Sequence, residues 1–295
     1  MMSATEQRVS IGGRHLTART QGEGPVVVLE PGASGGGVYG RVIEEVAQFA
    51  TVLTYDRAGV RESDPPAADP TVEDISSDLH LLLEAMAIER PVILVGWSLT
   101  GLSALIHPLL YPNDVRGIIL IDPTPFTLFD HPDRAGPLKD PEKAVRNAKL
   151  LARLGYGKWW GTSAMVAWLR KNCGPNVDEK SIRDYARSLT NITRYGALGE
   201  LRKMRQSCDV TKKLIAEHNF PQIPLIVLSA QVDTSISSEA STAKHANHKA
   251  IAELSALGRY VPIQHGSHMM TLDRPDAIVS ALKEVVLTAS ELPSV

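Results

Sequence analysis

The chain has 295 residues, of which 43% are hydrophobic and 22% charged, and its formal net charge at pH 7 is −2. These values are typical of a globular protein with a sizeable core, and the near balance of charge argues against nucleic acid as a partner. No apolar run approaches the roughly 20 residues that a membrane-spanning helix needs, and the polar start lacks a secretory signal. We therefore expect a cytoplasmic protein that does not bind a membrane.

The first elements in chain order predict a β-hairpin formed by residues 7–12 and 14–22, with a turn at Gly12 and Gly13. Short apolar runs follow, each ending near a turn residue or an acidic residue. Such runs are typical of strands buried on both faces of a parallel sheet. They cover residues 26–29, 51–55, 92–95, 118–121, 225–228 and 259–263.

Between these strands, helical spacing of apolar residues predicts helices over residues 38–50, 72–86, 98–110 and 275–287. Alternation of strands and helices predicts right-handed crossovers, with helices on both faces of the sheet. The sequence therefore predicts an α/β core with an antiparallel start on a mostly parallel sheet.

The alternation stops between about residues 124 and 220, where the pattern predicts helices only, over residues 141–154, 162–172, 179–189 and 198–216. Nine of the chain's 15 aromatic residues lie in this stretch. We predict a core domain of residues 1–123 and 221–295 and a helical cap of residues 124–220. The aromatic rings either line a pocket under the cap or form the cap's own small core.

The most informative segment is residues 91–101, where a buried strand runs through Gly96, Trp97 and Ser98 into a helix. A sharp strand-to-helix turn holds a serine in a strained backbone conformation with its hydroxyl exposed above the sheet. The helix N-terminus beneath it offers N–H groups to a developing oxyanion. Ser98 is therefore the candidate nucleophile, and the alternative is a simple helix N-cap serine.

This segment resembles the G-x-S-x-G nucleophile elbow of the α/β-hydrolase superfamily, and it departs from that motif at Thr100, with Gly101 following. The resemblance implies an eight-stranded, mostly parallel sheet with a helical cap insertion. It also implies a triad in the chain order serine, acid, histidine.

The histidine and the acid are assigned from this resemblance. His268 has the family's spacing to Pro275, whereas His265 lacks it and is the alternative base. Asp233, behind the strand that resumes the core, is the favoured acid, and Asp122, after the preceding strand, is the alternative.

The end of the first buried strand resembles the oxyanion loop of the family, with Pro31 in place of the usual histidine. By position, the backbone amides of Ala33 and Leu99 are the expected oxyanion donors. Residues 55–63 resemble the Asp-Arg-x-Gly-x-Gly-x-Ser turn of the family, and we expect Asp56 and Arg57 in it to be structural. The expected substrate-binding residues are Gly32, Ser34, Trp97, Phe126, Trp159 and Trp160.

The predicted activity is hydrolysis of an ester or lactone of an apolar small molecule through an acyl-enzyme. The same triad also suits carbon–carbon or amide bond hydrolysis, and a non-catalytic small-molecule-binding member of the fold remains an alternative. Serine at the elbow argues against dehalogenases and epoxide hydrolases, which place aspartate there. No cofactor is expected, and Cys173 and Cys208 lack the companions of a zinc site. The sequence leaves a homodimer open.

Overall fold

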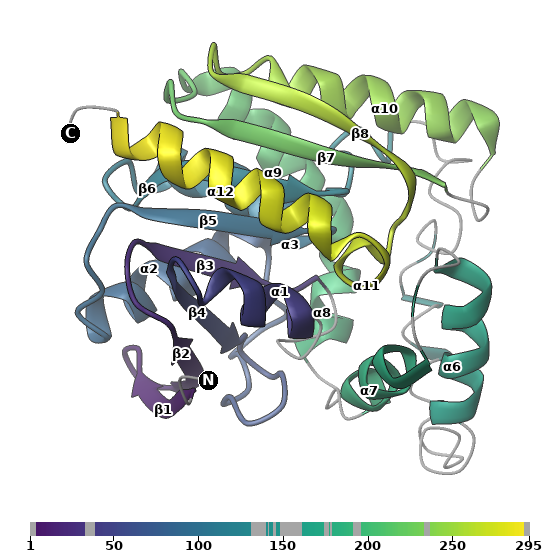
Figure 1. The fold of residues 1–295 in the computed structure, drawn as a ribbon, viewed down its shortest axis with the longest axis horizontal. Coiled ribbons are helices and arrows are strands. Elements are labelled where there is room, and N and C mark those ends of the chain that lie inside the picture. The colour runs from purple at the N-terminus through teal and green to yellow at the C-terminus, as the bar shows by residue number, and fades with distance from the viewer. Residues whose placement is uncertain are drawn as a thin grey trace.

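The computed structural model describes residues 4–32, 39–130, 140, 142–143, 146–147, 161–173, 177, 179–190, 196–232 and 237–291. An eight-stranded sheet forms its centre, with the strand order β1-β2-β4-β3-β5-β6-β7-β8 (Figure 1). The strands are β1 (Thr5–Ser10), β2 (His15–Gln21), β3 (Val26–Glu30), β4 (Thr51–Asp56), β5 (Val92–Trp97), β6 (Val115–Ile121), β7 (Leu225–Val232) and β8 (Gly258–Ser267).

The pairing of the strands follows the prediction of an antiparallel start on a parallel sheet. Strands β1 and β2 form the expected hairpin, and β2 pairs antiparallel with β4. From β4 onward, through β3, β5, β6, β7 and β8, every pairing is parallel. Because parallel strands end at the same edge, the residues that follow β3, β5, β6 and β8 meet at one edge of the sheet.

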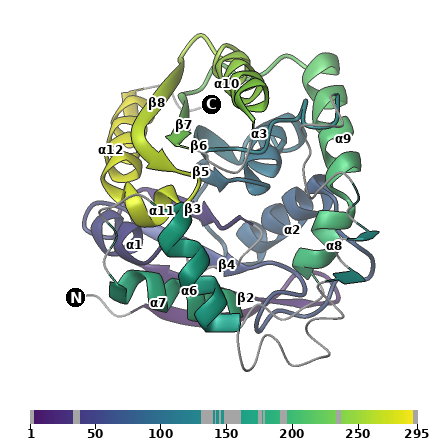
Figure 2. The same ribbon diagram turned by 90° about the vertical axis from the view of Figure 1, so that its right-hand side faces the viewer.

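Both faces of the sheet are covered by helices, which explains why its strands are apolar on both sides. Val27 and Leu29 pack on the face of α1 (Gly40–Val46) and α12 (Pro275–Glu291). Val28, between them, packs on the opposite face. That face carries α2 (Val72–Ala85), α3 (Thr100–Leu110) and α10 (Ser238–Ala252) (Figure 2).

The segment predicted to be a cap contains α6 (Gly161–Asn172), α7 (Glu179–Thr190), α8 (Gly196–Arg202) and α9 (Met204–Glu217). Helices α6 and α7 contact each other, and Tyr185 of α7 meets Trp97 of β5 edge to face, with ring centroids 6.4 Å apart. The predicted helix over residues 141–154 lies almost entirely outside the described residues. The proposed cap boundaries stay a prediction.

Helices α8, α9 and α10 differ from the sequence prediction. The single helix expected over residues 198–216 is broken at Lys203, so α8 points Glu200 into the core while α9 packs Met204 and Cys208 against α3. Helix α10 was not predicted, because its sequence lacks a strong apolar stripe. Its N-terminus is marked by Ser237, whose hydroxyl accepts the Ala240 N–H at 3.2 Å.

Candidate active site

Ser98 lies at the turn between β5 and α3 with a backbone φ of +57°, a left-handed conformation that is uncommon for a serine. Backbone bonds hold this turn on both sides. The Ser98 N–H donates to the carbonyl of Ile121 at 3.0 Å, and the Ser98 carbonyl accepts the N–H of Thr124 at 2.9 Å. The loop after β6 therefore fixes the backbone of Ser98, and the predicted strand–turn–helix arrangement is confirmed.

Close backbone approach explains the small residues of the elbow. A Cβ added to Gly96 would lie 2.3 Å from the carbonyl oxygen of Thr100, and one added to Gly101 would lie 2.5 Å from the Cβ of Pro123. Neither position tolerates a side chain without a shift of neighbouring atoms. Gly101 thus gives the loop after β6 room to approach α3.

Thr100, which replaces a glycine of the family motif, is fully buried and bonded within the elbow. Its hydroxyl accepts the N–H of Trp97 at 3.0 Å and lies 3.1 Å from the carbonyl oxygens of both Glu30 and Trp97. The side chain thereby joins the end of β3, which leads into the predicted oxyanion loop, to the end of β5. It adds a contact that a glycine could not make.

A chain of hydrogen bonds connects the serine to a histidine and a carboxylate. The Nε2 atom of His268 lies 3.1 Å from the Oγ of Ser98, and its Nδ1 lies 2.7 Å from the Oδ2 of Asp122. The imidazole of His268 is about two-fifths exposed, whereas Asp122 is buried. A buried carboxylate therefore holds an imidazole that can be reached from solvent, as a serine nucleophile and its base require.

The Asp122 carboxylate also binds the neighbouring strand and helix. Its Oδ1 accepts the N–H of Ala230 at 3.0 Å and lies 3.2 Å from the Nζ of Lys244. Burial alone would raise the pKa of Asp122, but the bond from His268 and the charge of Lys244 outweigh it, and the pKa lies well below its ordinary value. Asp122 is therefore ionised at neutral pH.

The orienting position on His268 is thus taken by Asp122, which the sequence ranked behind Asp233. Asp233 itself lies outside the described residues. Between the two candidate histidines, His268 makes the contact to Ser98, while His265 is exposed in β8 with a φ of +59°. Asp122 has a φ of +38°, and its N–H donates to the Leu228 carbonyl at 2.7 Å.

The predicted oxyanion loop is only partly described, since Ala33 and Ser34 lie outside the described residues. Gly32 packs so closely on the elbow that a Cβ there would lie 3.2 Å from the Trp97 ring and 3.4 Å from the Cβ of Ser98. Leu99 is the residue just before α3, where a helix has backbone N–H groups without intrahelical partners. This position suits the donor role expected of the Leu99 amide.

Arg57 binds the backbone of the loop that follows β3. Its guanidinium donates to the carbonyl of Pro31 at 2.5 Å and to that of Gly32 at 2.8 Å. The same group makes a bidentate pair with Glu200 of α8, at 2.8 and 2.9 Å, and both side chains are buried. Arg57, expected to be structural, therefore links the loop after β3 to a helix of the predicted cap.

The aromatic residues predicted to bind substrate lie in different environments. Trp97 is 2% exposed, and its Nε1 donates to the carbonyl of His268 at 3.0 Å, so it fixes the histidine's backbone. Phe126 is half-buried and packs between two apolar clusters of the core. Trp159 and Trp160 lie outside the described residues. Their role in a pocket stays a prediction.

The protein contains a second Ser–His–Asp arrangement, which shows why exposure matters. The Oγ of Ser76 lies 2.8 Å from the Nδ1 of His107, whose Nε2 lies 3.1 Å from the Oδ2 of Asp114. Ser76 is 1% exposed and His107 fully buried, and burial lowers the pKa of His107. No substrate can reach this serine, so the network is structural.

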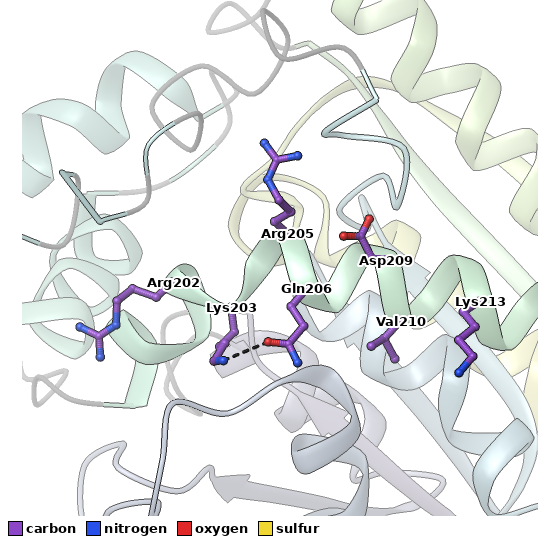
Figure 3. A pocket seen from close by; sticks show the side chains of 7 residues that line it. All are labelled: Arg202, Lys203, Arg205, Gln206, Asp209, Val210 and Lys213. Atoms are coloured by element: carbon purple, nitrogen blue, oxygen red, sulfur yellow. Dashed lines mark hydrogen bonds between the residues drawn. The ribbon is translucent and has the colours of Figure 1, made fainter.

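An open groove of about 480 Å³ runs along α8 and α9. Figure 3 shows that its side chains diverge: Arg205 points to one side of α9, while Lys203 and Lys213 point to the other.

No cluster of His, Cys, Asp and Glu suited to a metal ion occurs among the residues that the structure describes. Within the same residues no helix is long and apolar enough to cross a membrane.

The fold and the elbow define the class of protein, and a family comparison agrees with them. Residues 26–281 match the alpha/beta hydrolase family, and the chain belongs to that family.

Individual relatives are more distant. The chain is 30% identical over 121 residues to 2-(acetamidomethylene)succinate hydrolase of Mesorhizobium japonicum, a match that covers 41% of this chain and 43% of the relative. It is also 30% identical over 125 residues to the human serine hydrolase BPHL, covering 40% of this chain and 43% of that protein. The sequence matches thus span less than half the length of these curated relatives.

Solved structures match over nearly the whole chain. The enol-lactonase of Burkholderia xenovorans superposes with a TM-score of 0.66 at 17% identity, covering 95% of this chain and all of that one. At this identity the likeness concerns the fold alone.

Replacement of Thr100 tests its role in the elbow. Thr100→Val keeps the side-chain shape but leaves the buried Trp97 N–H without its acceptor, which should lower the free energy of unfolding by about 1–3 kcal/mol. Thr100→Ser keeps the hydroxyl and is the matched control. Urea unfolding of both variants measures the difference, and equal losses in the two would contradict the bonding role.

Replacement of Glu30 tests the buried carboxyl beneath the oxyanion loop. Burial raises the pKa of Glu30 from 4.5 to about 7, although Tyr55 and Ser103 donate to it. Because the pKa of Glu30 is higher in the folded protein than in the unfolded chain, the folded protein stays protonated there up to a higher pH. The free energy of unfolding therefore falls as the pH rises between these two values. Relative to Glu30→Gln, the free energy of unfolding of the wild type should fall by up to about 3 kcal/mol as the pH rises from 4.5 to 7. A difference in unfolding free energy that stays constant with pH would contradict this.

Proposed function

We propose that the protein is a serine hydrolase that cleaves a carboxylic ester or lactone of an apolar small molecule through an acyl-enzyme. The observation that carries this proposal is the chain of hydrogen bonds from Ser98 through His268 to Asp122. Ser98 itself has a left-handed backbone conformation just before the N-terminus of α3. The family and the names of its relatives support a hydrolytic reaction.

In the first half of the reaction, the Ser98 oxygen attacks the carbonyl carbon while His268 Nε2 takes the hydroxyl proton. The imidazolium that forms is stabilised by Asp122 at Nδ1. The negative charge on the former carbonyl oxygen is stabilised by backbone N–H groups, for which we propose the amides of Leu99 and Ala33. When the tetrahedral intermediate collapses, the alcohol oxygen leaves with the proton from His268.

In the second half, water replaces the alcohol. Neutral His268 takes a proton from water as its oxygen attacks the acyl carbon, and it returns that proton to Ser98 when the acid departs. For a lactone, the alcohol and the acid are ends of one product. The original proton of Ser98 leaves with the alcohol and a proton from water replaces it, so the enzyme is unchanged.

The setting of the nucleophile favours an apolar acyl group. Trp97, Met269 and Tyr185 belong to one apolar cluster beside Ser98 and His268. The acid in this proposal is Asp122, because it already binds His268, and Asp233 is the alternative kept from the sequence. Cap residues 124–220 would close over the acyl group, with Trp159 and Trp160 as proposed wall residues.

Replacement of the nucleophile tests this function. Ser98→Ala should lower the hydrolysis of p-nitrophenyl acetate, butyrate and octanoate by about 10³-fold or more, since the acyl-enzyme cannot form. A fluorophosphonate probe should label wild-type Ser98 stoichiometrically, as peptide mass spectrometry would show. Ser76→Ala, in the buried Ser–His–Asp network, is the matched control and should leave labelling intact.

Two results would contradict the proposal. Full ester hydrolysis in Ser98→Ala would place the nucleophile elsewhere. Failure of wild-type Ser98 to react with the probe at any pH would favour a non-catalytic binding protein.

A further inference from the structure

Lys244 is a buried cation beside the triad carboxylate. It comes from α10, its side chain is 9% exposed, and its Nζ lies 3.2 Å from Oδ1 and 3.5 Å from Oδ2 of Asp122. Lysine is seldom buried, because removing an ammonium group from water is unfavourable unless it is paired. A carboxylate that already binds His268 is therefore shared with a second positive group.

The two oxygens of Asp122 divide these contacts. Oδ2 accepts from Nδ1 of His268 at 2.7 Å, while Oδ1 accepts from the Ala230 N–H and faces Lys244. The net stabilisation of an imidazolium beside a carboxylate is smaller when another cation lies against the same carboxylate, because the two cations repel each other. In a buried site this effect is weakly screened by salt.

Other titratable groups near this carboxylate also come from α10. Burial lowers the pKa of His248 to about 4, and its ring lies 2.8 Å from the carbonyl of Pro123 and from the Ser229 hydroxyl. His248 is therefore neutral above about pH 5. The Nε2 of His245 lies 3.1 Å from the Ala230 carbonyl. On α11 (Met270–Asp273), the buried carboxylate of Asp273 accepts the N–H of Ser267, the residue before His268, at 3.1 Å.

We propose that Lys244 is a positioning residue that sets the pH at which His268 becomes a competent base. A protonated imidazole cannot take the serine proton. By opposing a second positive charge at this carboxylate, the ammonium of Lys244 keeps His268 neutral at lower pH and extends activity toward acid. This inference rests on the proposed triad, and it assigns to α10 a part in the chemistry.

The direct test is an NMR titration of the His268 imidazole, assigned by its absence in His268→Gln. In Lys244→Met the titration midpoint should rise by about one pH unit, because a nearby positive charge has been removed. Lys244→Arg keeps the charge and should keep the wild-type midpoint. Lys244→Gln is a second neutral variant, and thermal unfolding monitored by circular dichroism selects the neutral variants that fold.

A rate measurement complements the titration. The pH dependence of fluorophosphonate labelling should show its acidic limb displaced upward by the same amount in the neutral variants and not in Lys244→Arg. A residue that only held α10 in place would lower the labelling rate at all pH values without moving the limb.

The outcomes separate this inference from the proposed function. An unchanged His268 midpoint in folded Lys244→Met or Lys244→Gln, or equal displacement in Lys244→Arg, would overturn the role of Lys244. The NMR titration requires no turnover. Absence of labelling in the wild type together with a shifted midpoint would therefore reject the serine hydrolase and retain the electrostatic coupling.

Discussion

The arrangement of the site depends on the contacts of the Asp122 carboxylate, because they join parts of the chain that lie far apart in sequence. It follows β6, accepts a backbone N–H from β7, pairs with Lys244 on α10 and holds His268 after β8. The backbone at Asp122 is itself left-handed and tied to Leu228. One buried carboxylate thus contacts the imidazole that lies 3.1 Å from the Ser98 hydroxyl, and we propose that it fixes the tautomer and orientation of that ring.

A second set of buried polar groups supports the other side of the elbow. Thr100 bonds β3 to β5, and Arg57 holds the carbonyls of Pro31 and Gly32 while pairing with Glu200 of α8. Removing one partner of such a buried pair leaves an uncompensated charge, which is strongly unfavourable. The loop proposed to carry an oxyanion donor and the predicted cap are therefore coupled through one guanidinium.

Sequence reasoning identified the features that local patterns encode. Apolar runs gave the central strands, the elbow marked Ser98, and the spacing to Pro275 distinguished His268 from His265. It ranked Asp233 above Asp122, because whether an aspartate reaches His268 depends on the geometry of the strand ends, which neighbouring residues in the sequence do not encode. Helix α10 escaped prediction because it is polar along much of its length, and Lys244 has no local signal at all.

The most direct test of this account compares two isosteric changes, Asp122→Asn and Asp233→Asn, in the same ester assay. If Asp122 orients His268, Asp122→Asn should lower kcat/KM by about 10³-fold or more, because the amide stabilises neither the required tautomer nor the imidazolium. Asp233→Asn should change it by less than about threefold. Near-wild-type activity in Asp122→Asn, together with a large loss in Asp233→Asn, would contradict the assignment of the acid.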